Sequence, residues 1–120
     1  MASPRFKSVD EYLASLDPVK AATLQAVLDG LLADFPELQA KVAWNVPMLH
    51  RDGKYVAGVA AFAKHLTFAP WSPQVIAAFK PRLAGYVVRQ HLFQFPVDWK
   101  PDRKLLKAMV NARLAELDAE

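Results

Sequence analysis

The chain has 120 residues, of which 53% are apolar, and its formal charge at neutral pH is +3. This length suits a single domain, over residues 1–120, with enough apolar material for a buried core. The chain contains no cysteine, which excludes disulfides, thiolate metal sites and a cysteine nucleophile, and suits a reducing cytoplasm. The small basic excess does not indicate a nucleic-acid partner, and no apolar stretch approaches the ~20 residues of a membrane span. We therefore expect a cytoplasmic protein without a leader peptide.

Two helices are predicted in the N-terminal third of the chain. Ser8 and Glu11 can form a capping box, after which apolar residues follow at helical spacing. Asp17 and Pro18 end this helix and then supply the N-cap and the first position of a second one. The second helix ends at Pro36, and its predicted buried stripe consists of Leu24, Val27, Leu28, Leu31 and Phe35.

The period of the apolar residues then changes from helical to strand-like. Strands are predicted over residues 41–44, 48–51, 54–62 and 66–69. Asn45 to Pro47 is interpreted as a corner, because the residue before a proline avoids the helical region. Asp52-Gly53 predicts a hairpin turn. The strand over residues 54–62 is apolar on both alternating faces, which indicates a central strand covered from both sides.

The rest of the chain predicts one inserted helix, two short extended segments and a long terminal helix. Ser72 and Pro73 begin the inserted helix, and Asp102 begins the terminal one. The extended segments cover residues 86–90 and 92–95. Helices segregated from antiparallel strands define an α+β domain. The expected architecture is two N-terminal helices, an antiparallel β-meander with one inserted helix, and a long C-terminal helix.

The histidines and the acidic residues leave a metal or acid–base role open. His65 lies beside Lys64 and could act as an acid, a base or a ligand, although a lone histidine at a strand end more often bonds a carbonyl. His50, Asp52 and His91 show none of the spacings of a zinc site. The acidic residues of the N-terminal third could bind a hard or borderline cation such as iron, or they could form a solvated surface.

Arg113 falls inside the apolar stripe of the terminal helix, where a charge must be paired or must reach the surface. One interpretation is structural: the guanidinium ties the helix to sheet carbonyls or to a core carboxylate. The other interpretation is functional: the guanidinium clamps an anion at the rim of a pocket. The residue pattern leaves both open.

Aromatic residues cluster near two predicted corners, Trp44 near Pro47 and Trp71 near Pro70. Such residues can wall a ligand pocket, although they more often belong to a core. Because the chain has only 4 glycines, a glycine-rich phosphate loop cannot be built, and no serine lies in a nucleophile elbow. We assign no catalytic residue and do not expect an enzyme. The predicted ligand-binding residues are Trp44, Pro47, Met48, His65, Phe68, Trp71 and Arg113.

A family resemblance runs along nearly the whole chain, and Arg113 is part of it. The other segments that carry it are SVDEYLASLDP, WNVPML, DGK, AAFAKHLTFAP, FKPRLAGY and FQFP. On these features the chain resembles the YdhG-like domain family, a large bacterial group whose members mostly have no known activity. The resemblance implies an α+β fold similar to frataxin, and it implies iron as the cofactor to consider, because at least one member is an intracellular iron chaperone.

Two classes of function follow as expectations, and a third, a small enzyme, would require a pocket that brings His65, Arg113 and a carboxylate together. The first is a non-catalytic role in binding a small ligand or a metal, with iron delivery as the specific form that the resemblance implies. The second is a protein-interaction module that acts through a homodimer, an apolar patch or an exposed edge strand. The expected partner is accordingly a small ligand or another protein, including a second copy of the chain, and not a membrane or a nucleic acid.

Overall fold

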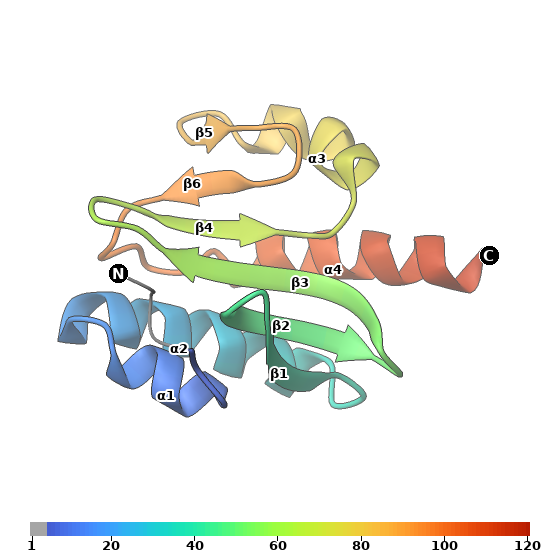
Figure 1. Cartoon of the computed structure of the whole chain (residues 1–120). Helices are drawn as coiled ribbons and strands as arrows, with labels where there is room; N and C mark the ends of the chain where they lie inside the picture. The colour runs from blue at the N-terminus through green and yellow to red at the C-terminus, as the bar shows by residue number, and fades with distance from the viewer. Residues whose placement is uncertain (1–4) are drawn as a thin grey trace.

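The computed structural model describes residues 5–120, and its centre is one antiparallel sheet (Figure 1). The strands are β1 (Gln39–Ala43), β2 (Val46–Arg51), β3 (Lys54–Ala61), β4 (Leu66–Ala69), β5 (Val87–Val88) and β6 (Phe93–Phe95). All six lie in the order β1-β2-β3-β4-β6-β5. The meander therefore runs through the first four strands, and the inserted helix carries the chain to the far edge.

The helices begin where the sequence places their caps. They are α1 (Val9–Ala14), α2 (Pro18–Asp34), α3 (Pro73–Phe79) and α4 (Arg103–Asp118), with a 3-10 turn over Lys80–Arg82. The side chains of Ser8, Asp17, Ser72 and Asp102 each accept a bond from the backbone N–H three residues later. The predicted α+β architecture is confirmed. No helix within residues 5–120 is both long and apolar enough to cross a bilayer.

A core fills the space between one face of the sheet and the helices α1, α2 and α4 (Figure 1). Every apolar residue predicted for the stripe of α2 is buried there. The strands contribute alternate residues to the same core, among them Leu66 and Phe68 of β4, which are both fully buried. This face carries the hydrophobic stabilisation of the fold.

The predicted corner at Asn45 to Pro47 is wrong, because the chain turns at Trp44 and Asn45, one residue earlier, and Val46 and Pro47 already belong to β2. Trp44 and Asn45 have φ angles of 52° and 63° and form a two-residue turn between β1 and β2. Pro47 lies inside β2 opposite Val42. The β2–β3 pairing begins only at Met48, so a proline without an N–H at position 47 leaves no bond of that ladder unmade.

The prediction that β3 is covered from both sides is also only half right. Its residues Val56, Ala57 and Val59 belong to the helix-covered core. On the opposite face, which we call the open face, no helix of residues 5–120 lies over the strand (Figure 1). The apolar residues there line a hollow instead.

Candidate functional site

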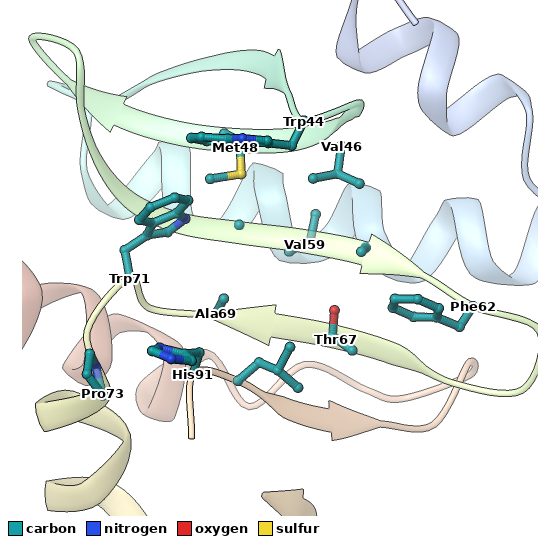
Figure 2. A pocket seen from close by; sticks show the side chains of 13 residues that line it. Trp44, Val46, Met48, Val59, Phe62, Thr67, Ala69, Trp71, Pro73 and His91 are labelled. Carbon is teal, nitrogen blue, oxygen red and sulfur yellow. The ribbon is translucent and has the colours of Figure 1, made fainter. Parts of the chain in front are cut away.

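The open face of the sheet is hollowed into a cavity of about 570 Å³, which we call the sheet hollow (Figure 2). Its floor consists of small residues at alternate positions of two paired strands, Gly58 and Ala60 of β3 and Thr67 and Ala69 of β4. Residues from β2, from the start of α3 and from the loop before β6 complete the lining. The hollow exists because the side chains on this face are small where those on the other face are large.

Gly58 sets the depth of the floor. A Cβ atom at this position would lie 2.8 Å from the sulfur of Met48 and 3.3 Å from Nε1 of Trp71. Both side chains therefore pack directly over a backbone that offers no side chain of its own. A larger residue at this position would displace them.

Trp44 and Trp71 line one side of the hollow, and the Tyr55 ring packs against both indoles; we call these three rings the aromatic rim. The centroids of the two indoles are 5.3 Å apart at 31°, and the Tyr55 ring lies 5.0 Å from Trp71 and 5.4 Å from Trp44. Lys41 places its ammonium 5.3 Å from the centroid of the Tyr55 ring, on the outer side of this cluster. Trp44 is 70% exposed and Trp71 is 39% exposed, so the rim remains open to solvent.

Both tryptophans of the rim have left-handed backbones. Their φ angles are 52° at Trp44 and 58° at Trp71, a region that costs a residue with a Cβ about 1–2 kcal/mol. Neighbouring contacts hold them there. Asn45 accepts a 2.8 Å bond from the N–H of Phe6, and Ser72, next to Trp71, caps α3. Strain of this kind is found often at ligand sites.

Polar groups in the hollow are few and carry no fixed charge. Thr67 is 5% exposed, and Figure 2 shows its hydroxyl oxygen directed into the hollow. No hydrogen bond of this hydroxyl occurs within residues 5–120, and its oxygen is open to the hollow, because every fully buried side-chain oxygen or nitrogen of the described chain has a partner. The indole N–H of Trp71 and the imidazole of His91 complete the set, and no Asp, Glu, Lys or Arg of the described chain lines the hollow. The hollow thus offers apolar contact with a small number of neutral hydrogen-bonding groups.

The structure brings three of the predicted site residues together and separates the others from them. Trp44, Met48 and Trp71 line the hollow. Pro47 and Phe68 alternate with residues of the open face and so point to the helix-covered side, where Phe68 is fully buried. Proximity to a proline corner in sequence could not reveal which face each residue occupies.

His65 lies outside the sheet hollow. Its ring stacks on Phe62 with centroids 5.0 Å apart at 19°, and Phe62 is the residue of this pair that lines the hollow. His65 itself contributes to a separate shallow depression beside Tyr86 and Trp99. The imidazole is therefore at most a neighbour of the hollow.

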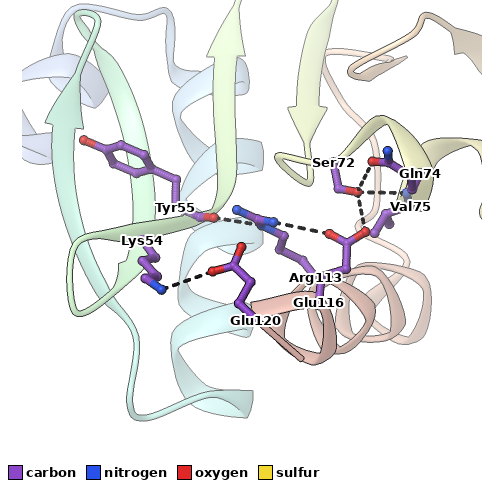
Figure 3. A network of polar contacts seen from close by, with 8 residues as sticks. All are labelled: Lys54, Tyr55, Ser72, Gln74, Val75, Arg113, Glu116 and Glu120. Carbon is purple, nitrogen blue, oxygen red and sulfur yellow. Dashed lines mark hydrogen bonds and ion pairs between the residues drawn. The ribbon is translucent and has the colours of Figure 1, made fainter. Parts of the chain in front are cut away.

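Arg113 bonds to the protein's own groups (Figure 3). Its Nε donates to the carbonyl of Tyr55 at 3.1 Å, and a terminal nitrogen donates to Glu116 at 3.3 Å. The other oxygen of Glu116 accepts a 2.7 Å bond from the hydroxyl of Ser72. These contacts match the structural interpretation of Arg113, and they fasten the backbone beside Tyr55 and Trp71 of the aromatic rim to α4.

Sequence reasoning missed much of the lining of the hollow. The missed residues include Gly58, Ala60, Phe62, Thr67, Ala69 and His91. The signal for the floor was a set of small residues two positions apart, Gly58 and Ala60 in β3 and Thr67 and Ala69 in β4. That signal was interpreted as a buried strand, because an apolar run cannot tell a covered face from a hollow one.

The described groups with displaced pKa values lie away from the hollow. Burial raises the pKa of the Tyr12 hydroxyl, and the N–H of Ala61, which donates to it at 2.9 Å, lowers that pKa in part. The guanidinium of Arg103 holds the pKa of the Asp34 carboxyl below its usual value through two 3.0 Å bonds. These shifts arise from packing and from a helix–helix ion pair. Residues 5–120 also contain no group of three or more His, Asp or Glu placed to hold a metal ion.

Comparisons with known proteins agree with this fold. No family model matches the sequence. A relative from Bacillus subtilis strain 168 named intracellular iron chaperone frataxin is 29% identical over 109 residues, which cover 88% of each chain. An uncharacterised conserved protein from Lactobacillus casei has a TM-score of 0.59 at 24% identity, over 92% of this chain and 93% of that one, and shares the fold alone.

The crystal structure of YdhG from Bacillus subtilis, a protein of the DUF1801 family, is similar throughout. Its TM-score with this chain is 0.86 at 28% identity, and the match covers 92% of this chain and 91% of that one. These two comparisons support the resemblance of this chain to the YdhG-like DUF1801 family.

Proposed function

We propose that this protein is a non-catalytic binding protein that takes a small, largely apolar molecule into the sheet hollow. The observation that carries the proposal is the hollow itself: about 570 Å³ over a floor of small side chains, on a sheet face that no described helix covers (Figure 1). Ligand pockets commonly measure ~300–1,000 Å³ and combine apolar walls with a few polar groups. The location we propose is the cytoplasm, which fractionation of cells producing the tagged chain would test.

A small molecule fits this surface better than a protein partner does. A stable protein interface buries roughly 800 Å² on each partner and is usually flat with a polar rim. The hollow is instead concave, and its depth depends on a glycine, Gly58, packed under Met48 and Trp71. Such local depth suits a molecule that enters it.

The test is calorimetric titration of the whole chain with 1-octanol and with 2-naphthol, compared between two Ala→Leu variants. Ala60→Leu adds a side chain to the floor and should abolish binding. Ala115→Leu makes the same change at an exposed position of α4 and should leave binding intact. Absence of saturable binding of both probes, or equal binding by the two variants, would overturn the proposal.

Iron delivery is the second candidate, because the Bacillus subtilis relative at 29% identity is named an iron chaperone. Residues 5–120 hold no ready cluster of three metal ligands. Iron binding by this chain therefore requires fewer protein ligands, or donors from another molecule. Anaerobic calorimetric titration with ferrous iron at neutral pH tests the candidate, and a lack of saturable micromolar binding would exclude it.

A protein-interaction module is the competing class, and one observation favours it. Trp44 and Phe62 are 70% and 49% exposed on the open face, and exposed aromatics are enriched at interfaces. Light scattering over a wide concentration range tests a homodimer through this face. A strict monomer at the highest concentration would remove the homodimer.

A further inference from the structure

The aromatic rim keeps two bulky residues where the backbone favours glycine or asparagine. Trp44 and Trp71 both have positive φ angles, which residues with large side chains rarely adopt. Trp44 gains little burial in return, because it is 70% exposed. A local rule broken without a gain in stability points to a functional cause.

The strained positions aim both indoles at one place. The two rings lie 5.3 Å apart and within 31° of parallel, and the Tyr55 ring lies within 33° of Trp71. Figure 2 shows the indoles on one side of the hollow and Phe62 at its other end. Flat π-surfaces on two sides favour a flat aromatic guest, because offset-stacked and edge-to-face contacts add to the burial of area.

A polar group on the floor of the hollow, open to it and without a protein partner, supplies a second, independent observation. Thr67 is 5% exposed, its hydroxyl has no protein partner within residues 5–120, and it is directed into the hollow. A hydroxyl in such surroundings is satisfied by a ligand group or by water. Since no Asp, Glu, Lys or Arg of the described chain lines the hollow, a charged ligand would lose hydration there without meeting a carboxylate, an ammonium or a guanidinium.

We propose that the ligand of the sheet hollow is a neutral, planar aromatic molecule with a hydrogen-bonding group, stacked on the rim at Trp44 and Trp71 and bonded to the hydroxyl of Thr67. This inference rests on the proposed function and narrows it to one chemical class. The aromatic rim selects flat rings over saturated ones. Thr67 orients the ring by its polar edge.

The experiment compares 2-naphthol with decahydro-2-naphthol, which has the same carbon skeleton and hydroxyl but no aromatic ring. Calorimetric titration of the whole chain should show 2-naphthol binding roughly threefold to tenfold more tightly. Equal affinity would overturn the aromatic inference and leave the proposed function standing. Absence of binding by both compounds would overturn the aromatic inference, and the proposed function would fall with it only if 1-octanol also failed to bind.

Two substitutions test whether the preference for 2-naphthol over decahydro-2-naphthol depends on the aromatic rim. Trp44→Asn removes an indole at a φ that asparagine tolerates, so it should abolish the preference for 2-naphthol while leaving the urea midpoint unchanged or higher. Val19→Asn, at an exposed apolar position of α2, is the control and should keep the preference. A large fall in the urea midpoint for Trp44→Asn, or a preference that survives it, would contradict a binding role for the rim.

Thr67→Val keeps the shape of the side chain and removes its hydroxyl. It should weaken 2-naphthol roughly threefold to tenfold and leave naphthalene, which has no hydrogen-bonding group, unaffected. Equal losses for the two compounds would show that Thr67 acts through the shape of the floor. That result would overturn its assigned role as the polar contact.

Discussion

The two faces of the sheet are built from the same strands but filled in opposite ways. In β4, Leu66 and Phe68 face the helices and are fully buried, whereas Thr67 and Ala69 face the hollow. In β3, Val59 is part of the core, whereas Gly58 and its open-face neighbours are small. A sheet under pressure for stability alone would fill both faces, because each buried apolar side chain adds about 1.5–3 kcal/mol. The contrast indicates that one face holds the fold together and the other keeps space for something else.

The largest expected effect comes from breaking the filled face. Phe68→Ala should lower the free energy of unfolding by about 3–5 kcal/mol, because it leaves a cavity in a packed core. The neighbouring change Thr67→Val, on the open face, should alter it by less than about 1 kcal/mol. Urea denaturation followed by circular dichroism measures both. Comparable losses for the two variants would contradict the division of the sheet into a structural and a hollow face.

Arg113 joins α4, on the filled face, to the backbone beside the aromatic rim. Its replacement should have the next largest effect on the free energy of unfolding. Arg113→Gln removes the bonds to the carbonyl of Tyr55 and to Glu116, and should lower the free energy of unfolding by about 1–2 kcal/mol. Arg113→Lys keeps the positive charge but lacks the planar guanidinium. Its free energy of unfolding should lie between those of the wild type and Arg113→Gln. Urea denaturation of the wild type and the two variants measures these differences. Unchanged stability, combined with lost binding of an anion such as phosphate, would favour the anion-clamp interpretation instead.

Substitutions at two glycines, one in the sheet hollow and one in a helix, test the same comparison with a smaller expected effect on stability. Gly58→Ala should cost about 1 kcal/mol, because its Cβ would meet the Met48 sulfur at 2.8 Å and a flexible side chain must move. Gly30→Ala is the control, in the middle of α2, where the nearest atom to a new Cβ lies at 3.8 Å. It should raise stability by about 0.5–1 kcal/mol, since alanine favours a helix over glycine. Thermal unfolding distinguishes a loss at one site from a gain at the other.

The sequence predicted best those features that depend on local chemistry. The caps at Ser8, Asp17, Ser72 and Asp102 depend on a side chain and a backbone N–H three residues away, and all four are confirmed. The Asp52-Gly53 turn is equally local, and both residues have positive φ angles. Short-range geometry of this kind needs no knowledge of the rest of the fold.

The parts that the sequence did not predict depend on tertiary placement. The Trp44–Asn45 turn contains no glycine, and the corner was predicted at Asn45 to Pro47 because of the proline. The hollow is a property of which face the helices leave open, and an apolar run such as 54–62 looks the same whether one face or both are covered. His91 lines the hollow only because the loop before β6 returns beside β4, which no spacing in the sequence reveals.

The smallest expected effect on stability comes from an ion pair on the helix-covered side of the sheet. Asp34 at the end of α2 pairs with Arg103 at the start of α4, on the helix side of the sheet, and this pairing holds the pKa of the Asp34 carboxyl below its usual value. The contribution of a carboxyl with a lowered folded-state pKa is fully present above its unfolded pKa, and it is lost as the pH falls through the lower folded value. Asp34→Asn should therefore slightly reduce stability at neutral pH.

The same variant should also flatten the decline in stability between about pH 5 and pH 2, because it no longer takes up the proton that the wild-type carboxyl takes up on unfolding. Urea midpoints across this range measure the slope, with Glu37→Gln as the control at an exposed acid outside the ion pair. An Asp34→Asn profile parallel to that of the wild type would contradict the assignment. Binding of 2-naphthol in the hollow should not follow this change, since the ion pair lies on the other side of the sheet and no described carboxylate lines the hollow.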